Sequence, residues 1–222
     1  MGSVKIMMLD CSMNSRKAPA PRPYHHGDLR RALIGAALAI AAEEQNWSFS
    51  LREVARRAGV SHNAPYNHFP ERRDLLAAVA AVGFDRLRIA MRAALARAHG
   101  AESALLAIGQ AYVAFAVKNP ALYRLMFGPE LLQPHGVRPA PTEAADAVAK
   151  LVLHEVIAHG AESGQFALPA SGDSVGMAAL AAWSAVHGLA MLIIDNKTSH
   201  PGQHKKLAQG VIAHLVQGLR WR

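Results

Sequence analysis

The sequence contains a single cysteine and few aromatic residues, and it lacks the motifs typical of several classes of enzyme. Its single cysteine, Cys11, lies in a Pro-rich N-terminal segment and has no second cysteine to pair with, as in proteins of a reducing cytosol. Aromatic residues make up only 6% of the 222 residues. The chain also has no Gly-rich phosphate loop and no nucleophile motif. His154 and His159 are five positions apart, a poor spacing for a shared metal on a helix. These absences argue against an enzyme and predict neither a cofactor nor a metal site.

Long uncharged hydrophobic runs are also scarce, and only one has to be considered as a membrane-spanning helix. Residues 176–194 carry no formal charge and are long enough to span a bilayer. Much of this run is Ala and Gly, however, it contains Ser184 and His187, and no second span accompanies it. We therefore expect a buried helix, of the kind that a bundle core or an oligomer interface requires. The N-terminal "VKIMML" is too short for a signal peptide and is interrupted by Lys5, which predicts a cytoplasmic protein.

What the sequence does contain is helix-forming apolar residues and an uneven positive charge. Stretches of Ala, Leu and Val with helical spacing predict an all-α fold. The formal net charge is +8, of which residues 1–100 carry +7 (15 Lys and Arg against 8 Asp and Glu). A basic N-terminal half indicates that this end of the protein meets a polyanion.

The chain divides into a Pro-rich tail over 1–23, which we expect to be disordered, a small helical domain over 24–75, and a larger one over 76–222. About nine helices are expected. The first runs from an Asp28 N-cap to about Gln45, with Asn46 in the left-handed position after it. The others are expected at about 51–58, 62–69, 71–98, 103–118, 121–127, 142–159, 173–195 and 205–219.

The stretch "SLREVARRAGVSHNAPYNHFPERRDLL", residues 50–76, places two short helical patterns across a Gly-Val-Ser break. Ser50 and Glu53 form a capping-box pattern, in which each side chain accepts from the other residue's amide. Gly59 permits a sharp turn, and Val60 and Phe69 are apolar enough to anchor the unit to the core. This is the pattern of a helix-turn-helix, whose second helix enters the DNA major groove. By itself the pattern is weak, because ordinary helical hairpins share it.

Pro65 lies inside the second helical pattern, where it removes an N–H donor and disfavours the α conformation of Ala64. The simplest interpretation is that this helix begins late, with His62 or Asn63 as its cap. Pro65 then lies in the first turn, where a missing N–H costs little.

Polar residues around this break are the candidates for DNA contact. Short side chains that could reach base edges are Ser61, His62, Asn63 and Asn67, and flanking groups that could hold phosphates are Tyr66, His68 and Arg72. Ser50 and Arg52, at the start of the preceding helix, complete the set. Two alternatives stay open: the arginines of that helix form a merely solvated face, or Tyr66 and His68 are half-buried packing residues.

The same residues resemble the signature of tetracycline-repressor-like (TetR-family) transcriptional regulators. The signature runs V-A-x-x-A-G-V-S, a small residue, then Y-x-H-F, and the resemblance covers about 28–76. It implies a DNA-binding domain in which Tyr66 and His68 contact phosphate, whereas His62, Asn63 and Asn67 lie where bases are read. Two positions depart from the pattern: Arg72 replaces a usual Lys, and Pro65 replaces a usual Leu or Ile.

The C-terminal half carries a second, less specific resemblance. Trp183, His187 and Gly188 form a W-x-x-x-H-G pattern, which is similar to the WHG-type C-terminal domain of one branch of the same family. That resemblance implies a dimer and a small, apolar effector. Candidate effector-binding residues are Tyr112, Phe115, Tyr123, Met126, Phe127, His154, Trp183, His187 and Met191. For each of them, a purely structural place in the core is the alternative.

Together these patterns predict a ligand-responsive repressor that binds a palindromic operator as a homodimer and is released from DNA by its effector. The apolar surfaces of the last two helices, 173–195 and 205–219, exceed what one small bundle can bury and predict a four-helix dimer interface. Two other classes stay open: a non-specific nucleoid-type DNA-binding protein, which the charge alone allows, and an all-α enzyme.

Overall fold

A computed structural model of the chain describes residues 26–132, 137–170, 172–198 and 202–220. The predicted tail, 1–23, lies outside these residues. The described part contains eight α-helices, two short 3-10 helices and no strand, which confirms the all-α prediction. In chain order the helices are α1 (His26–Glu44), α2 (Leu51–Arg57), η1 (Ala64–Asn67), α3 (Arg72–Leu95), α4 (Ala101–Lys118), α5 (Pro120–Phe127), η2 (Pro129–Leu131), α6 (Ala140–Glu162), α7 (Ser174–Ile194) and α8 (His204–Arg220).

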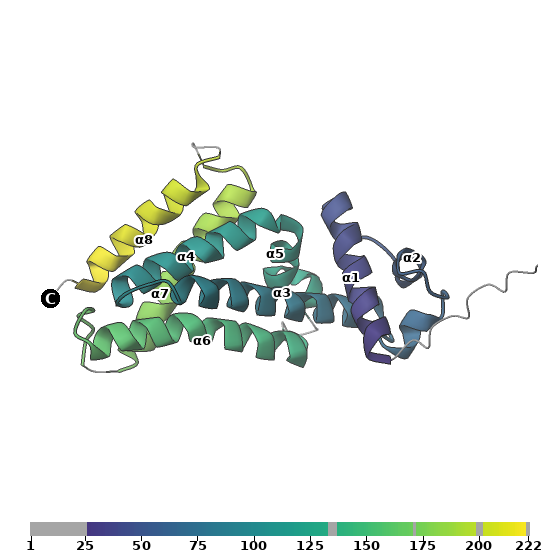
Figure 1. The fold of residues 1–222 in the computed structure, drawn as a ribbon, viewed down its shortest axis with the longest axis horizontal. Coiled ribbons are helices and arrows are strands. Elements are labelled where there is room, and N and C mark those ends of the chain that lie inside the picture. The colour runs from purple at the N-terminus through teal and green to yellow at the C-terminus, as the bar shows by residue number, and fades with distance from the viewer. Residues whose placement is uncertain (1–25, 133–136, 171, 199–201, 221–222) are drawn as a thin grey trace, which may run out of the picture.

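The helices form two groups along one long axis (Figure 1). The small group of α1, α2 and η1 lies at one end. Helix α3 begins at that end and runs into the larger group, where α4 and α6 pack along it. Helices α7 and α8 pack on each other and on α4. A single long helix therefore belongs to both groups and joins them mechanically.

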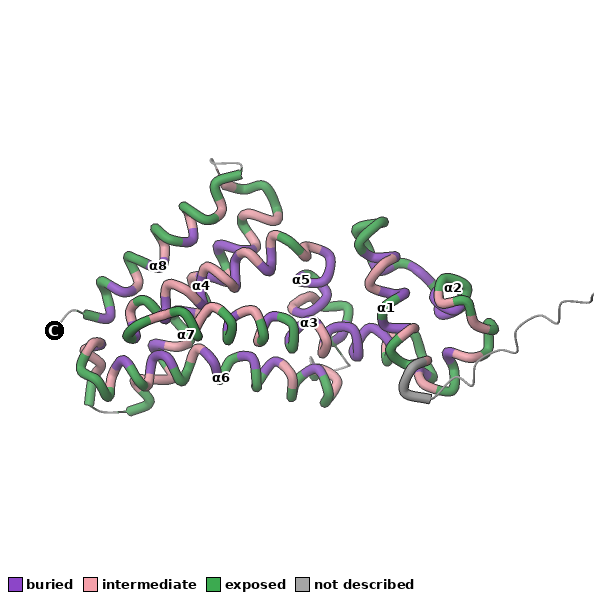
Figure 2. The backbone as a smooth tube through the Cα atoms, viewed as in Figure 1, coloured by how far each residue is buried: buried purple, intermediate pink, exposed green. Residues whose placement is uncertain are grey.

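Each group buries its own apolar side chains (Figure 2). In the small group one face of α1 is buried, since Leu33, Ala37 and Ile40 are at most 3% exposed. In the large group Tyr123 and Met126 of the short helix α5 are fully buried. The two cores are continuous through α3, so the two groups form one packed unit.

Several helix ends differ from the sequence prediction for identifiable reasons. Helix α1 begins at His26, two residues before the expected cap at Asp28, and Gln45 takes the left-handed conformation expected of Asn46, with φ 56°. Ser50 does cap α2, accepting from the Glu53 amide at 3.2 Å. The carboxylate of Glu53, however, accepts from Arg56 at 2.9 Å instead of reaching back to Ser50. A reciprocal capping box occurs at the start of α3, between Glu71 and Asp74.

Helix α7 is not the fully buried helix that its composition suggested. Among the described helices it is the one long and apolar enough to cross a membrane, or one of two if the bent pair α4–α5 is counted as a single span. Only 28% of its most apolar window is buried within the chain. Met177, Leu180 and Leu192 are each about half exposed or more, at 64%, 48% and 49%. The helix thus packs one face inward and presents a second apolar face outward.

The two helix groups are also joined by side-chain hydrogen bonds. The indole Nε1 of Trp47, in the α1–α2 loop, donates to the carbonyl of Ala121 in α5 at 2.9 Å. The guanidinium of Arg73 donates to the carbonyl of Leu131 at 2.9 Å. Because the Trp47 side chain is 8% exposed, its bond is shielded from water and links α5 directly to the small group.

Candidate nucleic-acid interface and effector cavity

The turn between α2 and η1 has the geometry that the sequence predicted. Gly59 has φ +69°, a left-handed conformation in which a side chain would be strained. Val60 packs against the core, and Phe69 is 2% exposed beneath the turn. The guanidinium carbon of Arg30 in α1 lies 5.3 Å from the centroid of the Phe69 ring. Apolar contacts therefore hold one side of the turn against the core, and its other side faces solvent.

Pro65 shapes the element after the turn. The helix begins at Ala64 with Asn63 as its N-cap residue, which confirms the predicted late start. It is a 3-10 helix of four residues, however, and the Asn63 side chain makes no capping bond. The Pro65 ring is buried, and its carbonyl accepts from the amides of His68 and Phe69, both at 2.9 Å. The proline thus serves as a buried support and as the acceptor that closes this short element.

The predicted base-reading residues all face solvent. Ser61, His62, Asn63 and Asn67 are exposed, and the Tyr66 side chain is 45% exposed although it is large and aromatic. His68 is half-buried, which agrees in part with the alternative that it packs. The structure brings all six into one continuous segment, 61–68, at the end of the long axis farthest from α8.

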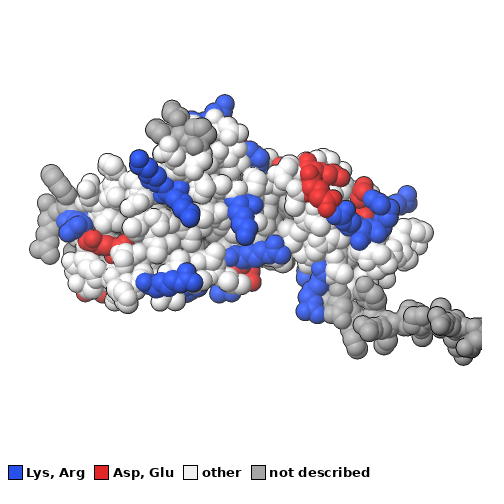
Figure 3. Space-filling model, turned by 45° about the horizontal axis from the view of Figure 1, so that its top comes forward, with Lys and Arg blue, Asp and Glu red and all other residues white. Residues whose placement is uncertain are grey.

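The basic side chains of α2 are partly neutralised. Arg56 forms an ion pair with Glu53 at 2.9 Å, and Arg57 with Glu43 of α1. Figure 3 shows these acidic and basic groups side by side over the N-terminal helices. Arg52 is exposed and makes no ion pair within the described part of the chain, so of the three arginines it is the one most available to a phosphate.

Arg72 has a structural role that the sequence did not reveal. Its Nε donates to the Phe49 carbonyl at 2.8 Å, and its Nη2 donates to the Trp47 carbonyl. These two bonds tie the α1–α2 loop to the start of α3, a task for which the planar fork of Arg is better shaped than an ammonium. The departure from the usual Lys is thus explained by the loop. The predicted phosphate contact of Arg72 stays a prediction.

In the large group, four predicted effector residues form one hydrogen-bonded cluster. The Tyr123 hydroxyl lies 2.7 Å from Nδ1 of His187 and 2.9 Å from the Tyr112 hydroxyl. Tyr112 in turn lies 3.1 Å from the same Nδ1 and accepts from the Trp183 indole at 3.2 Å. The residues come from α4, α5 and α7, so the cluster fixes three helices relative to one another.

Burial controls the protonation of this cluster. Desolvation raises the pKa of Tyr112 to about 12, and burial also raises that of Tyr123 well above its ordinary value. Desolvation, assisted by the positive charge of Arg138, lowers the pKa of His187. The cluster is therefore uncharged at neutral pH, and Nδ1 of His187 can accept a hydrogen bond from a tyrosine hydroxyl.

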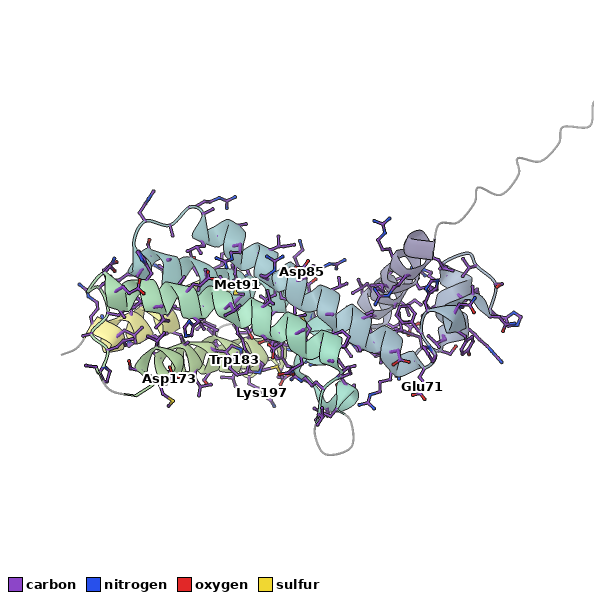
Figure 4. The ribbon with its side chains drawn as sticks, turned by 90° about the horizontal axis from the view of Figure 1, so that it is seen from below. Glu71, Asp85, Met91, Asp173, Trp183 and Lys197 are labelled. Atoms are coloured by element: carbon purple, nitrogen blue, oxygen red, sulfur yellow. The ribbon has the colours of Figure 1, made fainter. Side chains whose placement is uncertain are left out.

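Beside the cluster lies an apolar cavity of about 40 Å³ between α3, α4, α6, α7 and α8. That volume holds a few water molecules and is too small for a typical small-molecule ligand. Figure 4 shows Met91 of α3 and Trp183 of α7, which both line the cavity, at the same position along the long axis. Tyr112 and Phe127 line it as well.

The remaining predicted effector residues do not line the cavity. Phe115 and Met126 are buried elsewhere in the core, and Met191 is half-buried on α7. His154 is exposed and lines a separate groove on the surface. For Phe115 and Met126 the alternative of a purely structural place agrees better with the geometry.

Sequence reasoning missed the charged residues of the cavity. Asp146 is 4% exposed and accepts from Lys150 at 2.8 Å, with Arg138 3.6 Å away. Both Asp146 and Lys150 line the cavity. The signal was present as a spacing of four residues on one helix, but such pairs are common on solvated faces. Within the described residues, no group of three or more His, Cys, Asp or Glu is placed to hold a metal ion.

Comparisons with known proteins agree with both halves of this geometry. Residues 33–79 match the family model "Bacterial regulatory proteins, tetR family", and residues 105–215 match "Tetracyclin repressor-like, C-terminal domain". The second match alone covers half of the chain. The chain belongs to the tetR family. It is a DNA-binding transcriptional regulator with a helix-turn-helix, and this family is not one of enzymes.

Individual relatives support the same assignment. The chain is 30% identical over 146 residues to an uncharacterised HTH-type transcriptional regulator of Bacillus subtilis, YobS, covering 65% of this chain and 72% of that protein. A solved structure of a protein of unknown function from Rhodococcus sp. RHA1 is similar at 29% identity and a TM-score of 0.76, covering 90% of this chain and all of that one. A tetR-family regulatory protein from Rhodococcus RHA1 shares the fold at 21% identity and a TM-score of 0.63, covering 86% and 96%.

Proposed function

We propose that this tetR-family regulator is a cytoplasmic repressor that binds a pseudo-palindromic operator as a homodimer and leaves it when a small effector occupies the C-terminal domain. The observation that carries the DNA part is the exposed polar segment 61–67, which rests on the buried Pro65 and Phe69. Polar side chains displayed on a rigid apolar support are what base-edge recognition requires.

The outward faces of α7 and α8 support the homodimer. On α7 the exposed Met177, Ala181, Ser184 and Gly188 follow one side of the helix. On α8 the half-buried apolar side chains accompany Gly210 and Gly218, and a Cβ added at either glycine would meet nothing within 4 Å. Small residues and apolar side chains on two adjacent helices allow a second copy to pack closely, giving two-fold symmetry.

Helix α5 supports the coupling between effector and DNA. Its Phe127 lines the cavity, whereas its Ala121 carbonyl accepts from Trp47 in the DNA-binding group. Since the cavity of about 40 Å³ must enlarge to admit an effector, helices around it must move, and α5 carries that movement to the α1–α2 loop. In a dimer, such a shift changes the separation of the two DNA-binding segments, which operator spacing does not tolerate.

The DNA part is tested by footprinting on the DNA upstream of the protein's own gene, followed by titration of the protected site. We expect a protected palindrome, and His62→Ala or Asn67→Ala should weaken discrimination against base changes by about 1–3 kcal/mol. His99→Ala is the matched control, because His99 is exposed in the loop between α3 and α4, far from the segment 61–67. Uniform coverage of the DNA, with a steep salt dependence and no effect of these variants, would instead indicate a non-specific DNA-binding protein.

The dimer is tested by sedimentation of two matched variants. Ala181→Glu places a charge on the outward face of α7, whereas Ala93→Glu makes the same change at an exposed position of α3. We expect Ala181→Glu to shift the protein to monomer and to weaken operator binding, and Ala93→Glu to do neither. A wild-type monomer at micromolar concentration would refute the dimer.

A further inference from the structure

Three side chains lie between the inner cavity and a groove on the surface. On the outside, α6 and α7 enclose a groove of about 320 Å³, whose lining includes Leu151, His154, Ala179 and Leu180. Lys150, Leu153 and Trp183 line both this groove and the inner cavity. They therefore form the wall between the two. The groove alone lies at the lower end of the range for small-molecule sites, about 300–1,000 Å³, and it joins the inner cavity if these side chains move aside.

The charge at this wall is unbalanced. The buried carboxylate of Asp146 faces two cations, Lys150 at 2.8 Å and Arg138 at 3.6 Å. One negative and two positive charges leave an excess of one positive charge beside an otherwise apolar cavity. Among the described residues that line the groove, Lys150 carries the only formal charge.

Each of the two cations is held against an aromatic ring of the cavity. Nζ of Lys150 lies 4.6 Å from the centroid of Trp183, and the guanidinium carbon of Arg138 lies 5.9 Å from that of Phe127. The rings fix the cations at the rim by cation–π attraction. An apolar molecule that displaced the Trp183 ring would therefore enter the cavity directly beside both positive groups.

We propose that the effector is an organic anion with an elongated apolar body, which fills the joined groove and cavity and places its acidic group at Lys150 and Arg138. This inference rests on the proposed function of the C-terminal domain as an effector site. The ammonium of Lys150 has three N–H donors, so it can hold a ligand carboxylate while still bound to Asp146. An organic cation would meet two like charges and find the one carboxylate already paired.

The test uses the full-length protein and three matched series of probes: straight-chain fatty acids from hexanoate to tetradecanoate, and the corresponding primary alcohols and amines. Binding is measured by calorimetric titration below the micelle concentration of each probe. We expect at least one acid to bind, its alcohol to bind roughly tenfold more weakly or worse, and its amine not to bind. Equal binding of acid and alcohol, tighter binding of the amine, or no binding by any acid would overturn the proposal.

Two variants change the same charge balance in opposite directions. Lys150→Met should weaken acid binding by roughly tenfold or more, and Asp146→Asn should tighten it, because the competing carboxylate is gone. Lys118→Met makes the same side-chain change at an exposed lysine outside both volumes and should have no effect. Melting curves identify a variant that fails to fold. If Lys150→Met does, Asp146→Asn decides alone, and weaker acid binding in that variant overturns the proposal.

Operator binding on the same preparations separates this inference from the proposed function. If no acid binds but the operator is still recognised, the ligand class is wrong and the DNA-binding proposal stands. If an acid binds through Lys150 yet leaves operator affinity unchanged, the ligand class stands and the effector-release mechanism is wrong.

Discussion

The two ends of this regulator treat polar side chains in opposite ways. At the DNA-binding end, His62, Asn63 and Asn67 face water above a buried proline and a buried phenylalanine. In the C-terminal domain, Tyr112, Tyr123 and His187 turn inward and bond to one another. The first arrangement leaves hydrogen-bonding groups for an external partner, whereas the second satisfies them internally. The chemistry of a side chain alone therefore does not reveal its role. The role follows from the residues that support the side chain and from whether its hydrogen-bonding groups already have partners within the protein.

The strongest way to break this comparison is to remove the support under the DNA-binding segment. Phe69→Ala empties a fully packed site, and we expect a loss of about 3–5 kcal/mol in the free energy of unfolding together with loss of operator binding. Tyr66→Ala, at an exposed ring directly above, should change stability by no more than about 0.5 kcal/mol while also weakening operator binding. Chemical denaturation and DNA titration measure the two effects. A stable Phe69→Ala protein would show that the segment does not depend on this anchor.

Removal of one tyrosine hydroxyl should lower the free energy of unfolding when the tyrosine is in the inward-facing cluster, but not when it is in the outward-facing segment. Tyr123→Phe removes a buried hydroxyl bonded to both Tyr112 and His187, and we expect a cost of about 2 kcal/mol. Tyr66→Phe makes the same change at an exposed ring and should leave the unfolding free energy unchanged. Equal effects in the two variants would remove the distinction between the two ends.

Arg72 sharpens the comparison, because it was predicted to face outward and is found holding the loop. Arg72→Lys cannot keep both carbonyl bonds, and we expect a stability loss of about 1 kcal/mol. If this is its whole role, the salt dependence of operator binding will not change in an Arg72→Met protein. If Arg72 also contacts a phosphate, the slope of log affinity against log salt will fall by about 0.9.

The smallest expected effect is on the pH dependence of stability. Because the folded state lowers the pKa of His187 below its ordinary 6.5, the neutral form contributes stability above that pH, and this contribution is lost as the pH falls through the folded value. Burial of the ring is the main cause of this lowered pKa; the positive charges of Arg138 and Lys150 add to it, and the carboxylate of Asp146 opposes it. Tyr112 and Tyr123 contact the ring through Nδ1. We expect the melting temperature of His187→Gln to fall less than that of wild type between pH 7 and pH 5. His99→Gln, at an exposed position, should follow wild type.

The fold was largely readable from the sequence, because helix periodicity and breakers such as Gly59 and Asn119-Pro120 are local signals. Helix ends were less accurate: Asp28 lies inside α1, and Gln45 takes the left-handed position, since a helix terminus shifts by one or two residues at little cost. The late start at Pro65 was predicted correctly, because the proline's missing N–H and fixed φ are properties of one residue.

The proposed effector site was harder to predict, because burial is not local information. Asp146 and Lys150 have the spacing of an ordinary surface pair, and it is the packing of other helices against α6 that encloses the carboxylate. Conversely, Phe115 and Met126 have the composition of a ligand pocket but are used to pack the core. Arg72 was assigned to phosphate by resemblance, and no sequence pattern indicated that the carbonyls of Trp47 and Phe49 would lie within its reach.

The short element that begins at Ala64 bears on the thermodynamics of operator binding. Pro65 restricts one backbone torsion, its carbonyl closes the turn, and the Phe69 side chain locks it in place. The backbone that carries these side chains is thus restrained while the protein is free in solution. Little chain entropy is then lost when the segment binds DNA. A short element of four residues can therefore serve for binding, whereas a flexible segment would need a larger contact surface.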